Sequence, residues 1–125
     1  MKIKQGEIYW VPLENATGLV ASYTHPHVVL QDDTLNRSRI DTVVVCALTT
    51  NLKQAKAPGN VLLDEGEANL PKQSVVVVSQ VSTVNKSQLG EYIGNLSEQR
   101  IDQILAGMRF QQKIAAKRAT NEYEA

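Results

Sequence analysis

Four side chains in this sequence suit proton transfer or hydrogen bonding to a ligand, and each borders an apolar run. The set comprises His25, Thr49, Thr50 and Gln80. An imidazole exchanges protons near neutral pH, whereas hydroxyl and amide groups hydrogen-bond to anionic oxygens. If the strands that carry them are neighbours, these groups would share one polar rim. The same groups also satisfy backbone at strand ends, and composition alone favours that simpler role.

Two histidines and one cysteine could also bind a metal ion or react, but the sequence gives little support for either role. His25 and His27 would project from the same face of a strand, so two imidazoles could share an ion. Two ligands are too few for a structural zinc site, and the sequence shows no third, so we predict no metal and no cofactor. Cys46 lies inside an apolar run and is predicted to be a buried thiol rather than a nucleophile. The sequence contains no CxxC pair, Walker loop, HExxH or GxSxG motif.

Composition limits the classes of protein that fit. The 125 residues include 13 basic and 13 acidic side chains, whereas duplex DNA-binding domains usually carry a basic excess. The longest apolar runs are far shorter than the ~20 residues that a membrane-spanning helix needs. The N-terminus has no hydrophobic signal region. We therefore expect one small cytoplasmic domain that does not cross a membrane.

Short strands separated by polar connections must position these residues. The run Thr42–Leu48 is almost entirely β-branched and apolar, which is typical of a strand buried on both faces. Segments 15–24, 32–41, 49–59 and 64–71 are predicted to be loops. The remaining expected strands are Glu7–Leu13, Pro26–Gln31, Asn60–Leu63 and Ser74–Ser79.

Only the C-terminal segment has helical periodicity. Ser97 is a suitable N-cap, and Leu96 can pack on Ile101 across the first turn. The apolar stripe expected to face the core consists of Ile101, Ile104, Leu105 and Met108. Gly107 weakens a helix but permits close packing. Several short strands and one packed helix predict a mainly β fold, either a small barrel or a curled sheet.

Several blocks of the sequence, in order, match the pattern of one known family. Two of them are the opening Gln5-Gly-Glu-Ile-Tyr-Trp-Val-Pro-Leu and the stretch Val44-Val-Cys-Ala-Leu-Thr-Thr-Asn-Leu-Lys. The others are His25-Pro-His-Val-Val-Leu, Pro58-Gly-Asn-Val-Leu-Leu, Gln73-Ser-Val-Val-Val-Val-Ser-Gln, Asn85-Lys-Ser-Gln-Leu-Gly and Ile93-Gly-Asn-Leu-Ser. Together these blocks resemble the MazF/PemK toxins of type II toxin–antitoxin systems. The resemblance implies a toxin domain over residues 1–111, followed by a helix end and flexible tail over residues 112–125.

That resemblance also implies a fold and a function. Members fold as SH3-like barrels of the MazF/CcdB/Kid type, carry a C-terminal helix and form homodimers. They are metal-independent endoribonucleases that cut single-stranded RNA, and a small antitoxin neutralises them. Their active site pairs an arginine with a threonine, and the 2′-hydroxyl of the RNA is the nucleophile.

Carried over residue by residue, the family's threonine falls on Thr49 and its strand-end glutamine on Gln80. Its arginine falls on His25, so catalysis here would use His25 and Thr49. The expected substrate-binding residues are Ser22, Tyr23, Asn36, Arg37, Thr50 and Gln80.

Replacing arginine by histidine leaves two functions open. His25 can act as a general acid or base while Arg37 or Arg39 supplies positive charge, which would retain cleavage. Alternatively, the protein is a catalytically degenerate dimer that binds antitoxin or RNA without cutting it. Inhibition of DNA gyrase, as by the CcdB toxins that share the fold, is the weakest alternative, because the sequence blocks match the RNA-cutting branch.

Overall fold

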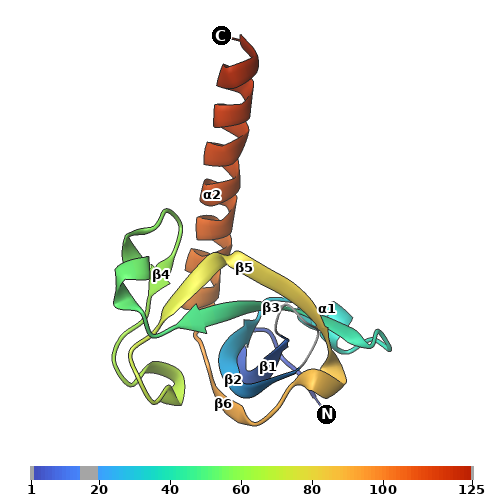
Figure 1. Cartoon of the computed structure of the whole chain (residues 1–125). Coiled ribbons are helices and arrows are strands. Elements are labelled where there is room, and N and C mark those ends of the chain that lie inside the picture. The colour runs from blue at the N-terminus through green and yellow to red at the C-terminus, as the bar shows by residue number, and fades with distance from the viewer. Residues whose placement is uncertain (1, 15–19, 125) are drawn as a thin grey trace.

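The computed structural model describes the backbone of residues 2–14 and 20–124, and the side chains of residues 2–12 and 24–113. Within these residues a six-stranded antiparallel sheet has the order β4-β5-β3-β2-β1-β6. It curls beside one long C-terminal helix (Figure 1). The strands are β1 Glu7–Glu14, β2 Val20–Val29, β3 Thr42–Thr49, β4 Val61–Leu62, β5 Val75–Asn85 and β6 Tyr92–Asn95. The helices are α1 Asp33–Asn36 and α2 Glu98–Glu124, and the short 3-10 turns are η1 Leu52–Lys56, η2 Glu67–Asn69 and η3 Lys86–Gln88. The mainly β prediction with a C-terminal helix is confirmed.

Two apolar clusters lie on the two faces of the sheet, and β3 contributes to both. Cys46 and Leu48 belong to the cluster that includes Ile104 of α2, whereas Val43 and Val45 belong to the other. Alternate residues of a strand point to opposite faces. The predicted burial of β3 on both faces is therefore confirmed.

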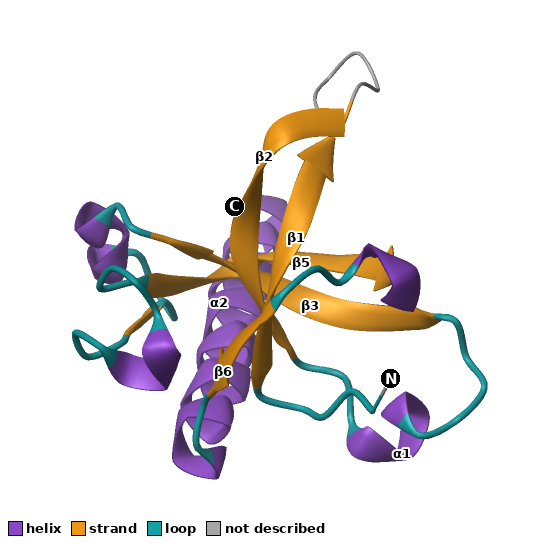
Figure 2. Ribbon diagram, turned by 90° about the horizontal axis from the view of Figure 1, so that it is seen from below, coloured by secondary structure: helices purple, strands orange, loops and turns teal. Residues whose placement is uncertain are grey.

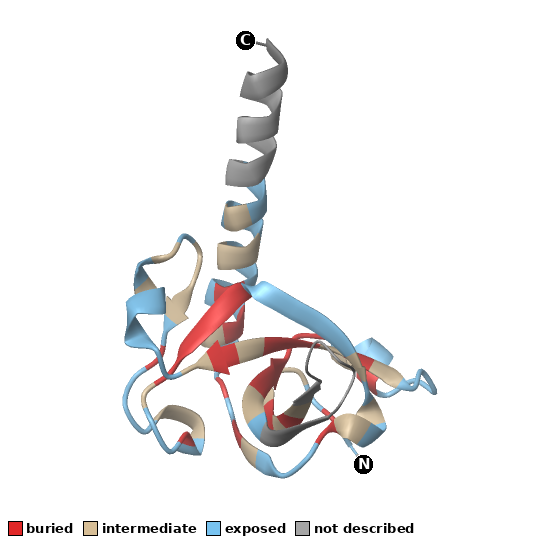
Figure 3. Ribbon diagram, viewed as in Figure 1, coloured by how far each residue is buried: buried red, intermediate tan, exposed pale blue. Residues whose placement is uncertain are grey.

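Two strands are longer than the sequence indicated. We expected a loop up to Thr24, but β2 begins at Val20 and pairs with β1 from Glu14↔Val20 to Ile8↔Val28. We expected a strand ending at Ser79, but β5 continues to Asn85 along β3. The second half of β5 is exposed although it is paired (Figure 3). It therefore lacks the buried apolar residues on which the prediction relied.

The predicted start of the helix is confirmed. The hydroxyl of Ser97 accepts a hydrogen bond from the N–H of Arg100 at 3.2 Å. Leu96 and Ile101 are both buried, and Met108 packs against the core. Leu105, which we expected in the buried stripe, is 41% exposed because it lies at the stripe's outer margin.

Two glycine backbones are in contact where α2 packs against the loop between η1 and β4. A Cβ atom at Gly107 would overlap the carbonyl oxygen of Gly59, and a Cβ at Gly59 would overlap that of Gly107. Gly59 also has a φ of +83°, which disfavours other residues. The close packing expected at Gly107 is thus confirmed, and it fixes the chain after η1 against the helix.

Beyond this contact α2 projects from the sheet (Figure 1). The division at residue 111 and the flexibility of residues 112–125 stay predictions. No helix among the described residues is long and apolar enough to span a membrane.

Candidate active site

The site forms where β2 and β3 stop pairing. Their register runs Val29↔Val45, Val28↔Cys46, His27↔Ala47, and two more residues would place His25 opposite Thr49. Pro26 has no backbone N–H to donate between the strands, and the paired residues of β2 indeed begin at His27. The pairing of β2 with β3 therefore stops beside His25 and Thr49. Thr49 ends β3 as expected, but His25 and Gln80, which we expected at strand ends, lie inside β2 and β5.

Two pockets meet where this pairing stops. The first has a volume of about 290 Å³, and the second of about 270 Å³. His25, Leu48 and Thr49 line both. The first is completed by Trp10, Thr24, Pro26, Thr50, Leu70, Pro71, Lys72 and Ser74. The second is completed by His27, Ala47, Asn51, Gln54, Val77 and Gln80. The structure thus brings together His25, Thr49, Thr50 and Gln80.

The two histidines have different environments. His27 is 3% exposed, and its Nδ1 lies 2.9 Å from the carbonyl oxygen of His25. A carbonyl oxygen can only accept, so Nδ1 of His27 carries the proton in this hydrogen bond. Burial lowers the pKa of His27, although the same hydrogen bond opposes the shift. His27 therefore holds the backbone of His25, whose half-buried side chain faces both pockets.

Thr49 keeps a hydrogen-bond donor for the pockets. Its Oγ1 accepts from the N–H of Asn51 at 3.2 Å, and Asn51 in turn accepts from the N–H of Lys53 to cap η1. A hydroxyl that accepts one bond can still donate its own proton. Thr49 therefore caps the turn and can also donate to a bound oxygen.

Gln80 lies in a bulge of β5. The β3–β5 register shifts between Cys46 and Leu48, so several residues of β5 stand opposite Ala47. The Cys46 thiol donates to the carbonyl oxygen of Val77 at 3.1 Å. Burial raises the pKa of Cys46 to about 12. The prediction of a buried, unreactive thiol is confirmed.

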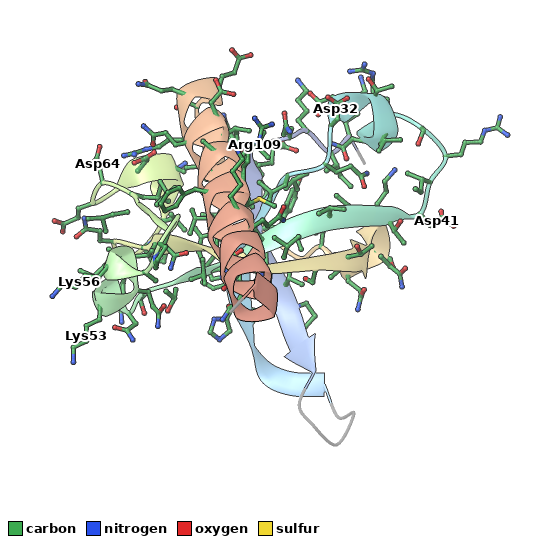
Figure 4. The ribbon with its side chains drawn as sticks, turned by 90° about the horizontal axis from the view of Figure 1, so that it is seen from above. Asp32, Asp41, Lys53, Lys56, Asp64 and Arg109 are labelled. Carbon is green, nitrogen blue, oxygen red and sulfur yellow. The ribbon has the colours of Figure 1, made fainter. Side chains whose placement is uncertain are left out.

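Asn36 and Arg37 line neither of these two pockets. α1 lies across the molecule from β4 (Figure 1), and Figure 2 shows it on the loop that leads into β3. Figure 4 shows Asp41, before β3, across the molecule from Lys53, after β3. Asn36 is 6% exposed and donates to the carbonyl oxygen of Gln31 at 2.8 Å. Arg37 lines a third pocket of about 540 Å³, together with Lys2, Ile3, Lys4, Asp33, Asn36, Ser38 and Lys86.

The structure does not describe the side chains of two predicted RNA-binding residues, and it bears on the possible metal site. The side chains of Ser22 and Tyr23 lie outside the described residues. Among the side chains that are described, no group of three His, Cys, Asp or Glu is placed to hold a metal ion.

Five residues that line the two pockets were not predicted from the sequence: Trp10, Asn51, Gln54, Lys72 and Ser74. Lys72 falls just after a segment that we treated only as a connection. β5 pairs with the end of β3 through Thr49↔Val75. Given that pairing, residues just before Val75 must lie near Thr49, so strand order was the missing signal.

Comparison with known proteins places the chain in a family. A family model described as PemK-like, MazF-like toxin of type II toxin–antitoxin system matches residues 4–111. Endoribonuclease MazF2 of Mycobacterium bovis is 35% identical over 109 residues, which cover 87% of this chain and 96% of that protein. Endoribonuclease EndoA of Bacillus subtilis is 29% identical over 104 residues, covering 83% and 89%.

Solved structures share the fold. A mycobacterial endoribonuclease in complex with its cognate antitoxin superposes with a TM-score of 0.69 at 21% identity, covering 85% of this chain and 90% of that one. A MazE–MazF structure from Deinococcus radiodurans gives a TM-score of 0.70 at 16% identity, covering 86% and 93%. At these identities the likeness supports the architecture.

Proposed function

This chain belongs to the PemK-like, MazF-like family of toxins of type II toxin–antitoxin systems, and we propose that it is a metal-independent endoribonuclease of single-stranded RNA. The observation that carries the proposal is the placement of His25 beside Thr49 between two pockets. Relatives that match most of the chain are named endoribonucleases, which supports the same activity.

The proposed reaction needs no group from outside the protein except RNA and water. His25 accepts the proton of a ribose 2′-hydroxyl, and the 2′-oxygen attacks the adjacent phosphorus. The bond to the 5′-oxygen breaks, that oxygen takes a proton from water, and the resulting hydroxide takes the proton held by His25. Thr49 donates to a non-bridging oxygen as negative charge grows there. The products are a 2′,3′-cyclic phosphate and a 5′-hydroxyl end.

The two pockets suit the nucleotides on either side of the cleaved bond. Trp10, Leu70 and Pro71 give the first pocket apolar walls, on which a base can stack. Asn51, Gln54 and Gln80 give the second pocket amides, which can hydrogen-bond to base edges. We assign sequence preference mainly to the second pocket for this reason.

The remaining partners follow from family membership. We propose a cytoplasmic homodimer that a small antitoxin peptide neutralises, because a structural neighbour was solved with its cognate antitoxin. Ser22, Tyr23 and Thr50 remain proposed RNA contacts. Arg37 is proposed to contact RNA at the third pocket, away from the cleaved bond. Asn36 acts there by holding the loop.

A second candidate function rests on one specific observation, the histidine at the family's arginine position. A histidine offers fewer hydrogen bonds to phosphate than an arginine does. On this alternative the protein is a degenerate dimer that binds antitoxin or RNA without cleaving.

Cleavage of a mixed-sequence single-stranded RNA in EDTA distinguishes the two functions. The wild type is expected to give discrete fragments with cyclic phosphate ends, and His25→Ala to reduce their formation by about 10²–10⁴-fold. DNA of the same sequence should stay intact, because it lacks the 2′-hydroxyl. Intact RNA with a folded, dimeric wild type would instead establish the binding-only function.

A further inference from the structure

The proposed reaction requires positive charge beside the phosphate, and His25 occupies the position where the family supplies it. Five-coordinate phosphorus carries more negative charge than the diester from which it forms, so a fixed cation accelerates the step. Of the two arginines first expected to compensate, Arg37 lines the third pocket, and Arg39 is exposed two residues further along the same loop before β3. The charge must therefore come from another side chain near Thr49.

Lys72 is the cationic side chain that lines the first pocket with His25 and Thr49. The pocket's lining includes no aspartate or glutamate that could neutralise it. Among the described residues, the ion pairs are those of Arg100 with Asp64 and Glu67. No described carboxylate therefore holds the Lys72 ammonium away from the pocket.

The backbone that carries Lys72 is fixed on both sides. Leu70 and Ser74 are buried, with exposures of 5% and 2%. The Ser74 hydroxyl donates to the carbonyl oxygen of Lys72 at 2.9 Å, and the amide of Gln73 donates to that of Leu63 at 2.9 Å. Pro71 restricts the chain further. The Lys72 side chain thus starts from a fixed point at the pocket wall.

We propose that Lys72 supplies the positive charge for cleavage, by binding a non-bridging oxygen of the scissile phosphate as the phosphorane forms. The proposal rests on the proposed ribonuclease function. A lysine ammonium is a compact point charge that binds phosphate well, without the planar fork of arginine. Thr49 and Lys72 would then share the stabilisation of the phosphorane, while His25 moves the proton.

The test compares Lys72→Gln and Lys72→Arg with the wild type in the EDTA cleavage assay. Removing one such stabilising contact costs about 10²–10³-fold in rate. We expect Lys72→Gln to lower kcat by about 10²-fold and Lys72→Arg to stay within about tenfold of wild type. Lys56→Gln is the matched control, because Lys56 is exposed on η1 and lines neither pocket.

A second measurement separates catalysis from binding. Affinity is measured on an RNA with a single 2′-deoxyribose at the mapped cleavage position, which can bind but cannot react. We expect Lys72→Gln to weaken this binding far less than it lowers kcat. Circular dichroism melting checks that each variant is folded.

The outcomes are distinct. An active wild type with Lys72→Gln within threefold of Lys56→Gln overturns the assignment of Lys72 alone. A loss confined to KM and to affinity for the 2′-deoxy RNA also overturns it, since Lys72 would then only bind substrate. A folded wild type that cuts no RNA overturns both this assignment and the proposed function.

Discussion

At the Thr42 end of β3, most nearby polar side chains are hydrogen-bonded within the protein. At the Thr49 end, several polar side chains line open pockets. Near Thr42, the amides of Gln31 and Asn36 bond to each other, and Gln31 also bonds to the carbonyl oxygen of Thr42. Lys86 Nζ donates to the carbonyl oxygens of Asn36 and Ser38. Near Thr49, the hydroxyl of Thr49 has a proton left to donate, and Lys72 has no described ion-pair partner.

Both ends look alike in the sequence, as polar stretches that flank an apolar run. The difference lies in how many hydrogen bonds the fold itself satisfies. A buried polar group with all its bonds made stabilises the structure, whereas a group with capacity left at a pocket can bind a ligand. We therefore expect substitutions at the two ends to affect different quantities.

The largest expected effect is on catalysis at the Thr49 end. Thr49→Val removes the hydroxyl at nearly constant shape, and we expect kcat to fall by about 10²-fold because one donor to the phosphate is lost. Stability should fall by only about 1 kcal/mol, through the lost bond from Asn51. Single-turnover cleavage and urea unfolding measure the two effects. Thr49→Ser, which keeps the hydroxyl, should remain close to wild type, and equal losses in both variants would contradict this role.

The next effect is on stability at the Thr42 end. Asn36→Ala leaves the buried amide of Gln31 without one partner, which costs about 1–3 kcal/mol. Urea unfolding should show this loss, while kcat per folded molecule stays unchanged. The control is Arg39→Ala, in the same loop and exposed. A fall in kcat at full stability would place Asn36 in the reaction and remove the contrast between the two ends.

The smallest effect is expected from Arg37→Gln. Arg37 is exposed and lies in the third pocket, so it can contribute a phosphate contact remote from the reaction. We expect KM for a long RNA to rise by about threefold at constant kcat, as for a weak, solvent-screened charge. Titrating a short and a long RNA shows whether the contact is remote. A drop in kcat of the size expected for Lys72→Gln would instead make Arg37 a source of the reaction's charge.

Much of the fold could be predicted because local signals agreed with burial. β3 has apolar residues on both faces, and Ser97 begins α2 as its cap. The second half of β5 was missed because it is exposed, so its sequence lacks the apolar alternation of a half-buried strand. β6 was missed because it is only four residues long and contains Gly94.

The site was predicted only in part. The resemblance indicated His25 and Thr49, and the structure places them at shared pockets. Lys72 could not be found, because it reaches the site through the pairing of two strands distant in sequence. Likewise, nothing local shows that Asn36 is buried, since its burial depends on the loop closing over Gln31.

The contact between Gly59 and Gly107 has a consequence for the newly made chain. Asn60, next to Gly59, donates to the carbonyl oxygen of Gln54 and accepts from the N–H of Val78. The wall of the second pocket is thereby tied to a helix residue 48 positions later in the sequence. Because a protein is synthesised from its N-terminus, this wall gains its final support only after the helix has been translated. The order of synthesis therefore delays the completed site until α2 has been made.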